Sequence, residues 1–163
     1  MAELTPPLPR EAWIVPVVNP DGLAAGTKNN ARDVDLNRNF AARNWVKEHA
    51  PRYCPGDAPE SEPEARLLSE LITRTGATRL VALHSPFRTV NYDGPARALA
   101  EKMGALNGYG ASGDIGYPTP GSFGSRYGVD LGLEVITLEI PVVTPEQAWL
   151  ENRLALLATL EPL

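Results

Sequence analysis

The sequence predicts an α/β fold, in which helices cover a sheet, because strand-like apolar runs alternate along the chain with amphipathic helical segments. Three short apolar runs suit buried strands: AWIVPVV at 12–18, TRLVALH at 78–84 and EVITLEI at 134–140. Helical patterns lie between and after these runs. The chain has 163 residues, of which 43% are apolar, and this is enough for one domain with a hydrophobic core.

The first predicted helix covers 61–76. It opens with a capping box of Ser61 and Glu64, and Gly76 suits its C-terminal end. Its apolar face is expected to contain Leu67, Leu68, Leu71 and Ile72.

Two further helices are predicted at 95–106 and 144–160. The last one has Thr144 as its N-cap and Pro145 at its first helical position, within a TPEQ capping box. The residues of the earlier helix that are expected to face inward are Leu99, Met103 and Leu106.

The composition argues against several classes of protein. A net charge of −5 without a block of like charge disfavours nucleic acid or an anionic membrane as a partner. No apolar run is long enough to span a bilayer, and the first residues do not resemble a signal peptide. The single cysteine, Cys54, rules out an internal disulfide and suits a reducing compartment, so the cytoplasm is the expected location.

A long polar segment follows the first strand-like run, at 19–40. Such a loop is usually either functional or disordered. Its end, DLNRNF, places Arg38 between Asn37 and Asn39, a set rich in donors that suits a bound carboxylate or oxyanion.

Two titratable residues lie at the ends of the later strands. His84 ends the strand at 78–84, and Glu139 lies near the end of the strand at 134–140. Sites in α/β proteins form beyond the carboxyl ends of strands, so these residues and the polar loop make a candidate site. Both residues also have explanations that involve no function. A histidine at the end of a strand is more often structural than a ligand. Glu139 either faces solvent or lines a site. His49 and Cys54 are expected at the surface.

Six motifs in a fixed order resemble a known family: NPDG, VDLNRNF, GDAPESEPEARLL, LHSP, TPGSFGS and ITLEIP. Together, over about residues 9–162, they resemble the zinc carboxypeptidases of the carboxypeptidase A type. They are most similar to the bacterial murein peptide amidases, which cut the γ-D-glutamyl–diaminopimelate bond of cell-wall peptides. This resemblance implies a three-layer α/β/α sandwich with a mixed sheet, zinc as cofactor and a peptide substrate.

The resemblance also implies roles for single residues. His84 matches the last zinc ligand, and Glu139 matches the general base that activates a zinc-bound water. Asn37 and Arg38 match the pair that holds the substrate carboxylate, and Tyr117 matches a mobile tyrosine above it.

Two positions depart from the family pattern. Lys28 stands where the family has an arginine that polarises the scissile carbonyl, so it is expected to be a weaker catalytic cation. Asp33 stands where the family commonly has glycine.

The larger departure is the absence of the family's His-x-x-Glu motif, which supplies the first two zinc ligands. We expect residues 1–163 to form a single catalytic-type domain that lacks the N-terminal part of the family fold. The expected consequences are an incomplete zinc site, an inactive chain, and self-association through exposed sheet edges. The alternatives are an ordinary metallocarboxypeptidase, or a non-catalytic fragment that binds peptide carboxylates.

Overall fold

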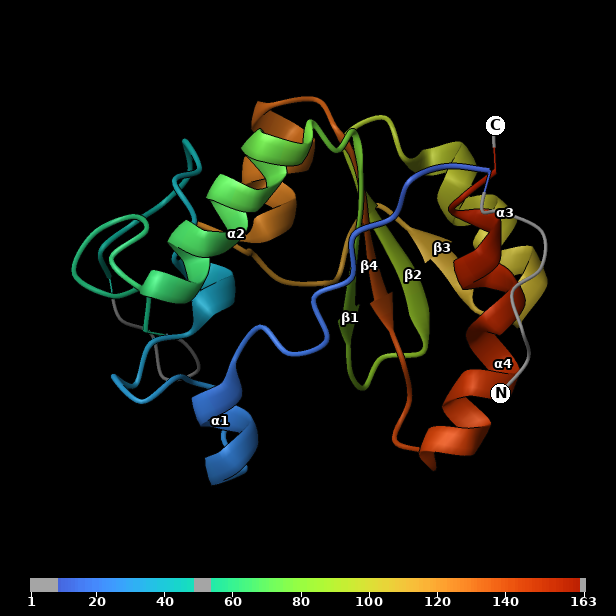
Figure 1. Ribbon diagram of the computed structural model, residues 1–163, viewed down its shortest axis with the longest axis horizontal. Helices are drawn as coiled ribbons and strands as arrows, with labels where there is room; N and C mark the ends of the chain where they lie inside the picture. Colours follow the sequence, from blue (N-terminus) through green and yellow to red (C-terminus); the bar gives the residue numbers. More distant parts are fainter. Residues whose placement is uncertain (1–8, 49–53, 162–163) are drawn as a thin grey trace.

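The computed structural model describes residues 9–48 and 54–161, and its centre is a mixed four-stranded sheet (Figure 1). The strands are β1 (Arg79–His84), β2 (Thr89–Asp93), β3 (Gly110–Ser112) and β4 (Glu134–Glu139), in the order β1-β4-β2-β3. β1 runs parallel to β4 and β2 runs antiparallel to it, while β3 is parallel to β2. The register pairs His84 with Glu139 at the carboxyl ends of β1 and β4.

Helices cover both faces of this sheet and give three layers (Figure 1). α3 (Arg97–Asn107) and α4 (Pro145–Ala158) lie on one face, and α2 (Pro63–Thr75) lies on the other with the π-helix η2 (Gly124–Asp130). Each face has its own apolar cluster. The α3/α4 face includes Val90, Leu99, Met103, Ile136, Leu138 and Ala155. The α2/η2 face includes Phe40, Ala65, Leu80, Tyr127 and Val135. The predicted α/β class and layered arrangement are confirmed.

The predicted strands at 78–84 and 134–140 and all three predicted helices are present, with small shifts at their ends. Gly76 ends α2 at φ +64°, and Thr144 caps α4 by accepting a hydrogen bond from the Gln147 backbone N–H. Two predicted inward residues, Leu67 and Leu106, are exposed instead.

The predicted capping box of the first helix is wrong. α2 begins at Pro63 with Glu62 as its N-cap and has no side-chain capping bond. The hydroxyl of Ser61 is already engaged, because it donates to the Glu62 carboxylate and accepts from the Asn39 amide.

The prediction of a strand at 12–18 is also wrong. This segment is described but joins no ladder, and β4 is the only neighbour of β1 among the described strands. Pro16 removes a backbone donor from its middle, and no described strand edge pairs with it. Its apolar side chains therefore stay in water, and Ile14 is 84% exposed.

Several short elements escape the sequence patterns. β2 and β3 are brief and carry polar or glycine residues, and η2 is a π-helix rich in glycine. The NPDG stretch is more than a turn, since Asn19 caps the short helix α1 (Pro20–Ala25). Among the helices of the described ranges, none has the length and apolar character needed to cross a bilayer.

Candidate active site

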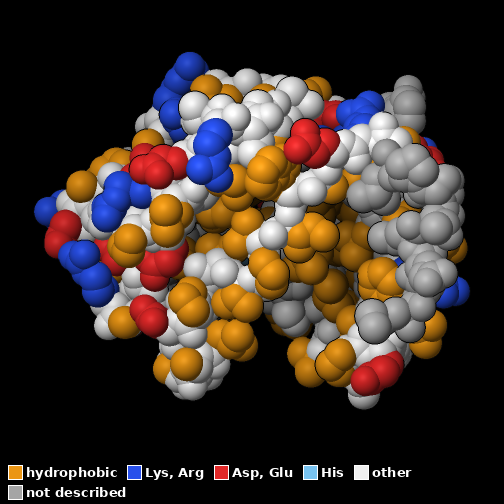
Figure 2. All heavy atoms as spheres, in the orientation of Figure 1, with side chains coloured by type: hydrophobic (Ala, Val, Ile, Leu, Met, Phe, Trp, Pro, Cys, Tyr) orange, Lys and Arg blue, Asp and Glu red, His pale blue; other side chains and the backbone are white. Residues whose placement is uncertain are grey.

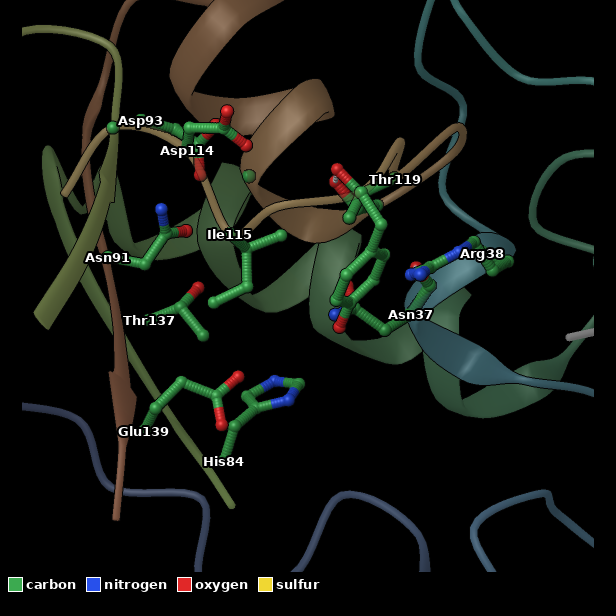
Figure 3. Close-up of a pocket in the computed structure, with 14 residues that line it drawn as sticks. Asn37, Arg38, His84, Asn91, Asp93, Asp114, Ile115, Thr119, Thr137 and Glu139 are labelled. Atoms are coloured by element: carbon green, nitrogen blue, oxygen red, sulfur yellow. Dashed lines mark hydrogen bonds between the residues drawn. The ribbon is translucent and has the colours of Figure 1, made fainter. Parts of the chain in front are cut away.

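A pocket of about 120 Å³ brings together five of the six predicted site residues (Figure 3). These five are Asn37, Arg38, His84, Tyr117 and Glu139. They come from four separate parts of the sequence, so only the fold makes them neighbours. The rest of the lining is Asn91, Asp93, Gly113, Asp114, Ile115, Thr119, Ser122, Gly124 and Thr137.

Glu139 faces the pocket, which answers the alternative that the sequence left open. Strand alternation puts Glu139 and Thr137 on the pocket side and sends Ile136 and Leu138 into the core. Glu139 is only 4% exposed, and burial raises the pKa of its carboxyl, while a hydrogen bond from the Phe87 backbone N–H acts in the opposite direction. Among the described residues, its Oε2 has no hydrogen-bond partner. A buried acceptor aimed at a pocket suits a general base.

His84 lies beside Glu139 at the end of the neighbouring strand (Figure 3). Burial lowers the pKa of His84, the negative charge of Asp35 raises it, and the positive charges of Lys28 and Arg38 lower it further. The neutral imidazole is therefore favoured, and this is the form in which histidine binds metals.

Asn37 and Arg38 form a pair of donors in the pocket, which we name the carboxylate clamp after the role expected from the sequence. They belong to the short 3₁₀-helix η1 (Leu36–Arg38), which Asp35 caps by accepting from the Asn37 backbone N–H. The Asn37 Oδ1 accepts from the Phe123 backbone N–H at 2.9 Å. That bond leaves the Asn37 amide NH₂ for the pocket. Arg38 is buried, and its Nη1 donates to the Asn37 carbonyl at 2.7 Å.

Lys28 is the predicted site residue that does not line the pocket. Its Nζ pairs with Asp35 Oδ2 at 2.5 Å, and its side chain is 61% exposed. Asp35 also caps η1, the helix that carries Asn37 and Arg38. The ion pair with Lys28 therefore stabilises the carboxylate clamp without entering the pocket.

The departure at Asp33 is accommodated in the backbone. Asp33 has φ +59°, a conformation that glycine adopts freely and aspartate tolerates better than most residues. Its carboxylate accepts from the Asn29 amide at 2.8 Å.

Tyr117 lines the pocket and is partly exposed. It is 45% exposed, and its ring centroid lies 6.3 Å from that of Phe87.

The described residues do not assemble a zinc site. Within 9–48 and 54–161, no three His, Cys, Asp or Glu side chains are grouped so as to hold a metal ion. His84 is the only histidine there, since His49 lies outside the described residues. A zinc site usually needs three or four protein ligands.

Sequence reasoning missed Asn91 and Asp93, which line the same pocket from β2. The signal was present in TVNYD, where both polar residues fall on one face of an alternating pattern. This alternating stretch is too short to predict a strand or a site by itself.

Comparison with known proteins places the chain in a family. The zinc carboxypeptidase family matches residues 10–101. Murein peptide amidase A of Escherichia coli strain K12 is 38% identical over 157 residues, which cover 89% of this chain and 64% of that protein. The Vibrio campbellii murein peptide amidase A is 34% identical over 142 residues, covering 79% of this chain and 56% of that one.

Solved structures agree with this relationship. The crystal structure of murein-tripeptide amidase MpaA from E. coli O157 matches with a TM-score of 0.76 and 34% identity, covering 90% of this chain and 67% of that one. Carboxypeptidase A of Helicoverpa armigera has a TM-score of 0.73 at 20% identity over 90% of this chain and 49% of that one, which supports the fold alone. This chain thus spans less than two thirds of the length of the E. coli relative in sequence. The chain belongs to the zinc carboxypeptidase family.

Proposed function

We propose that this chain carries the substrate-binding and general-base part of a murein peptide amidase-like peptidase, which acts on cell-wall peptides during their recycling. The observation that supports this most is the single pocket shared by Asn37, Arg38, Tyr117, His84 and Glu139. The relatives at 34–38% identity over most of the chain favour this branch over an ordinary carboxypeptidase.

The geometry supports a role for each group. The carboxylate clamp donates hydrogen bonds to a carboxylate of the peptide and fixes the position of the bond to be cut. Glu139 takes a proton from the attacking water and delivers it to the leaving amine. Tyr117 covers the bound peptide. Lys28 acts on the clamp only through its ion pair with Asp35.

Zinc is implied by the family, and His84 is its candidate ligand. The described residues form no group of three or more possible ligands around it. Since a catalytic zinc site usually has three protein ligands, we infer that the 163-residue chain by itself binds peptide without turning it over.

Binding can be tested without metal. L-Alanyl-γ-D-glutamyl-meso-diaminopimelate should bind the chain, and Arg38→Lys should weaken binding by about tenfold or more, because lysine loses the planar fork. Arg153→Lys, an exposed substitution on α4, is the matched control and should change nothing. Equal or tighter binding of an acetylated dipeptide that ends in phenylalanine would favour the ordinary carboxypeptidase. If Arg38→Lys left affinity unchanged, the clamp assignment would be wrong.

Metal content gives an independent test. After dialysis against zinc-free buffer, the chain should hold much less than stoichiometric zinc, as measured by atomic emission, because one histidine does not make a zinc site. A stoichiometric content that His84→Ala abolishes would show that the chain completes the site after all.

Two further features belong to this proposal. Self-association through the β1 edge is supported by the exposed Leu83 and by the apolar segment 12–18. A cytoplasmic location is supported by the single cysteine, which is free.

A further inference from the structure

The segment 119–125, which forms a turn and the start of η2, packs directly against the carboxylate clamp. Its residues that line the pocket are Thr119, Ser122 and Gly124. A Cβ at Gly121 would collide with the carbonyl oxygen of Arg38, and Gly121 has φ +67°. Glycine meets both conditions because it lacks a Cβ, and the turn can therefore approach the backbone of the clamp this closely.

This segment also sets the orientation of the Asn37 side chain. The Phe123 backbone N–H donates to Asn37 Oδ1 at 2.9 Å. An asparagine amide carries an acceptor on one side and donors on the other, and rotating it by half a turn exchanges them. The Phe123 N–H opposes this rotation, since a rotated amide would bring its NH₂ group against another donor. The position of Phe123 thus decides whether Asn37 offers the pocket a donor, which a carboxylate needs, or an acceptor, which a carboxylate repels.

Asn44 holds the segment on both sides of Phe123. Its Oδ1 accepts from the Gly121 backbone N–H at 3.0 Å, and its Nδ2 donates to Ser125 Oγ at 3.1 Å. Gly121 and Ser125 flank Phe123 in the sequence, so these two bonds fix the chain before and after the N–H that meets Asn37. Asn44 itself is exposed and does not line the pocket.

The chain around Asn44 also binds this region through its backbone. The Phe40 N–H donates to the Gly121 carbonyl at 3.0 Å, and the Arg43 N–H donates to Asp130 Oδ2 at 2.7 Å, at the end of η2. These bonds do not depend on the Asn44 side chain, so a substitution of Asn44 should leave the segment attached. Its effect should instead be a small displacement of Phe123, and a hydrogen bond weakens steeply when its geometry is disturbed.

We propose that Asn44 is a positioning residue for the carboxylate clamp. It holds Gly121 and Ser125 so that the Phe123 N–H keeps the NH₂ group of Asn37 directed at the bound carboxylate. Asn44 does not touch the ligand and acts through Phe123 and Asn37. This inference rests on the proposed function, because it takes the binding of a peptide carboxylate by the clamp as given.

The test is a double-mutant cycle on the full chain, with L-alanyl-γ-D-glutamyl-meso-diaminopimelate as the ligand in isothermal titration calorimetry. Asn44→Leu, which keeps the approximate size of the side chain and removes its hydrogen bonds, should weaken binding about 3- to 10-fold, as for one ordinary hydrogen bond. In an Asn37→Ala background the same substitution should have almost no effect, because the group through which it acts is gone. Arg43→Ala is the matched control, since the Arg43 N–H that binds Asp130 belongs to the backbone, and it should leave the affinity unchanged.

A second readout needs no ligand. The amide proton of Phe123 should give a nuclear magnetic resonance signal that moves upfield in Asn37→Ala, because its acceptor is lost. Asn44→Leu should move the signal in the same direction, and Arg43→Ala should not. If the unsubstituted chain failed to bind the tripeptide, the proposed function would be wrong, and this signal would still decide whether Asn44 orients Asn37.

Two results would overturn the inference. One is an affinity that Asn44→Leu leaves unchanged. The other is an equal loss of affinity in the presence and in the absence of the Asn37 side chain, which would mean that Asn44 does not act through Asn37. If Asn44→Leu does not fold, Asn44→Ser, which keeps a polar group at this exposed position but is too short to reach both partners, should give the same loss and the same dependence on Asn37.

Discussion

Glu139 and Asp93 are carboxylates that the fold withdraws from water, and burial raises the pKa of both. A raised pKa means that the folded state holds a proton more tightly than the unfolded state does. Folding stability is then lost as the pH rises from the ordinary carboxyl pKa through the raised one, and it stays reduced above that range. These two buried carboxylates therefore lower stability at neutral pH.

Glu139→Gln should make the protein more stable at neutral pH, because glutamine keeps the shape of the side chain and removes the buried charge. The advantage should disappear below about pH 4, where the carboxyl group is protonated in both states. Urea denaturation midpoints measured from below pH 4 to neutral pH will show whether the stability gained by Glu139→Gln grows as the pH rises. Glu70→Gln, at an exposed position of α2, is the matched control. A Glu139→Gln variant that is less stable at neutral pH would contradict this account.

At the residue scale the sequence predicted five of the residues that line the pocket and missed the others, Asp93 among them. Asn37, Arg38, His84, Tyr117 and Glu139 could be found because ordered motifs mark them. The pairing of Lys28 with Asp35 could not, since it depends on how the loop folds back over seven residues. Asp93 lacked a motif, and its position in the pocket follows only from the β2–β4 register.

At the scale of elements, the sequence correctly predicted the end of α2 at Gly76 and the beginning of α4 at Thr144, but not the beginning of α2. Glycine in a left-handed conformation ends α1, α2 and α3, at Gly26, Gly76 and Gly108. The start of α2 depended instead on contacts with Asn39, twenty-two residues before Ser61, which no local pattern reveals. The segment 12–18 shows the same limit, because its apolar run is strand-like and yet no described strand pairs with it.

Gly76→Ala should cost about 1 kcal/mol of folding stability, because alanine is strained in the left-handed conformation that ends α2. The neighbourhood of Gly76 is open, so backbone strain is the only penalty. Gly110→Ala is the matched control, since its surroundings are equally open and its φ is not positive. Chemical denaturation of both variants will separate the cost of the left-handed conformation from the general effect of replacing glycine by alanine. An equal cost in both would show that the conformation at Gly76 is not what matters.

At the scale of the whole molecule, apolar side chains gather between the α1 side and the α4 side of the face drawn in Figure 2. The segment 12–18 crosses in front of β1 in the ribbon view (Figure 1), and Leu83 of β1 is 59% exposed. A sheet edge next to exposed apolar residues is prone to pair with another chain.

The purified chain should therefore self-associate, with a mass in multi-angle light scattering that rises with concentration. Leu83→Lys should shift it toward the monomer, because a charge on an edge strand opposes pairing. Leu150→Lys, an equally exposed position on α4, should leave the association unchanged. A concentration-independent monomer with a sharp, cooperative melt would count against this expectation.

The hydrogen bond from the Phe123 amide to Asn37 joins positions 86 residues apart. Closing so long a loop is slow and entropically costly, so the clamp should be among the last parts of the molecule to form. Under the proposed function, a growing chain cannot hold a peptide during synthesis until the segment that carries Phe123 has left the ribosome. Ligand binding is consequently a late reporter of maturation: in refolding experiments it should lag behind the recovery of helical circular dichroism.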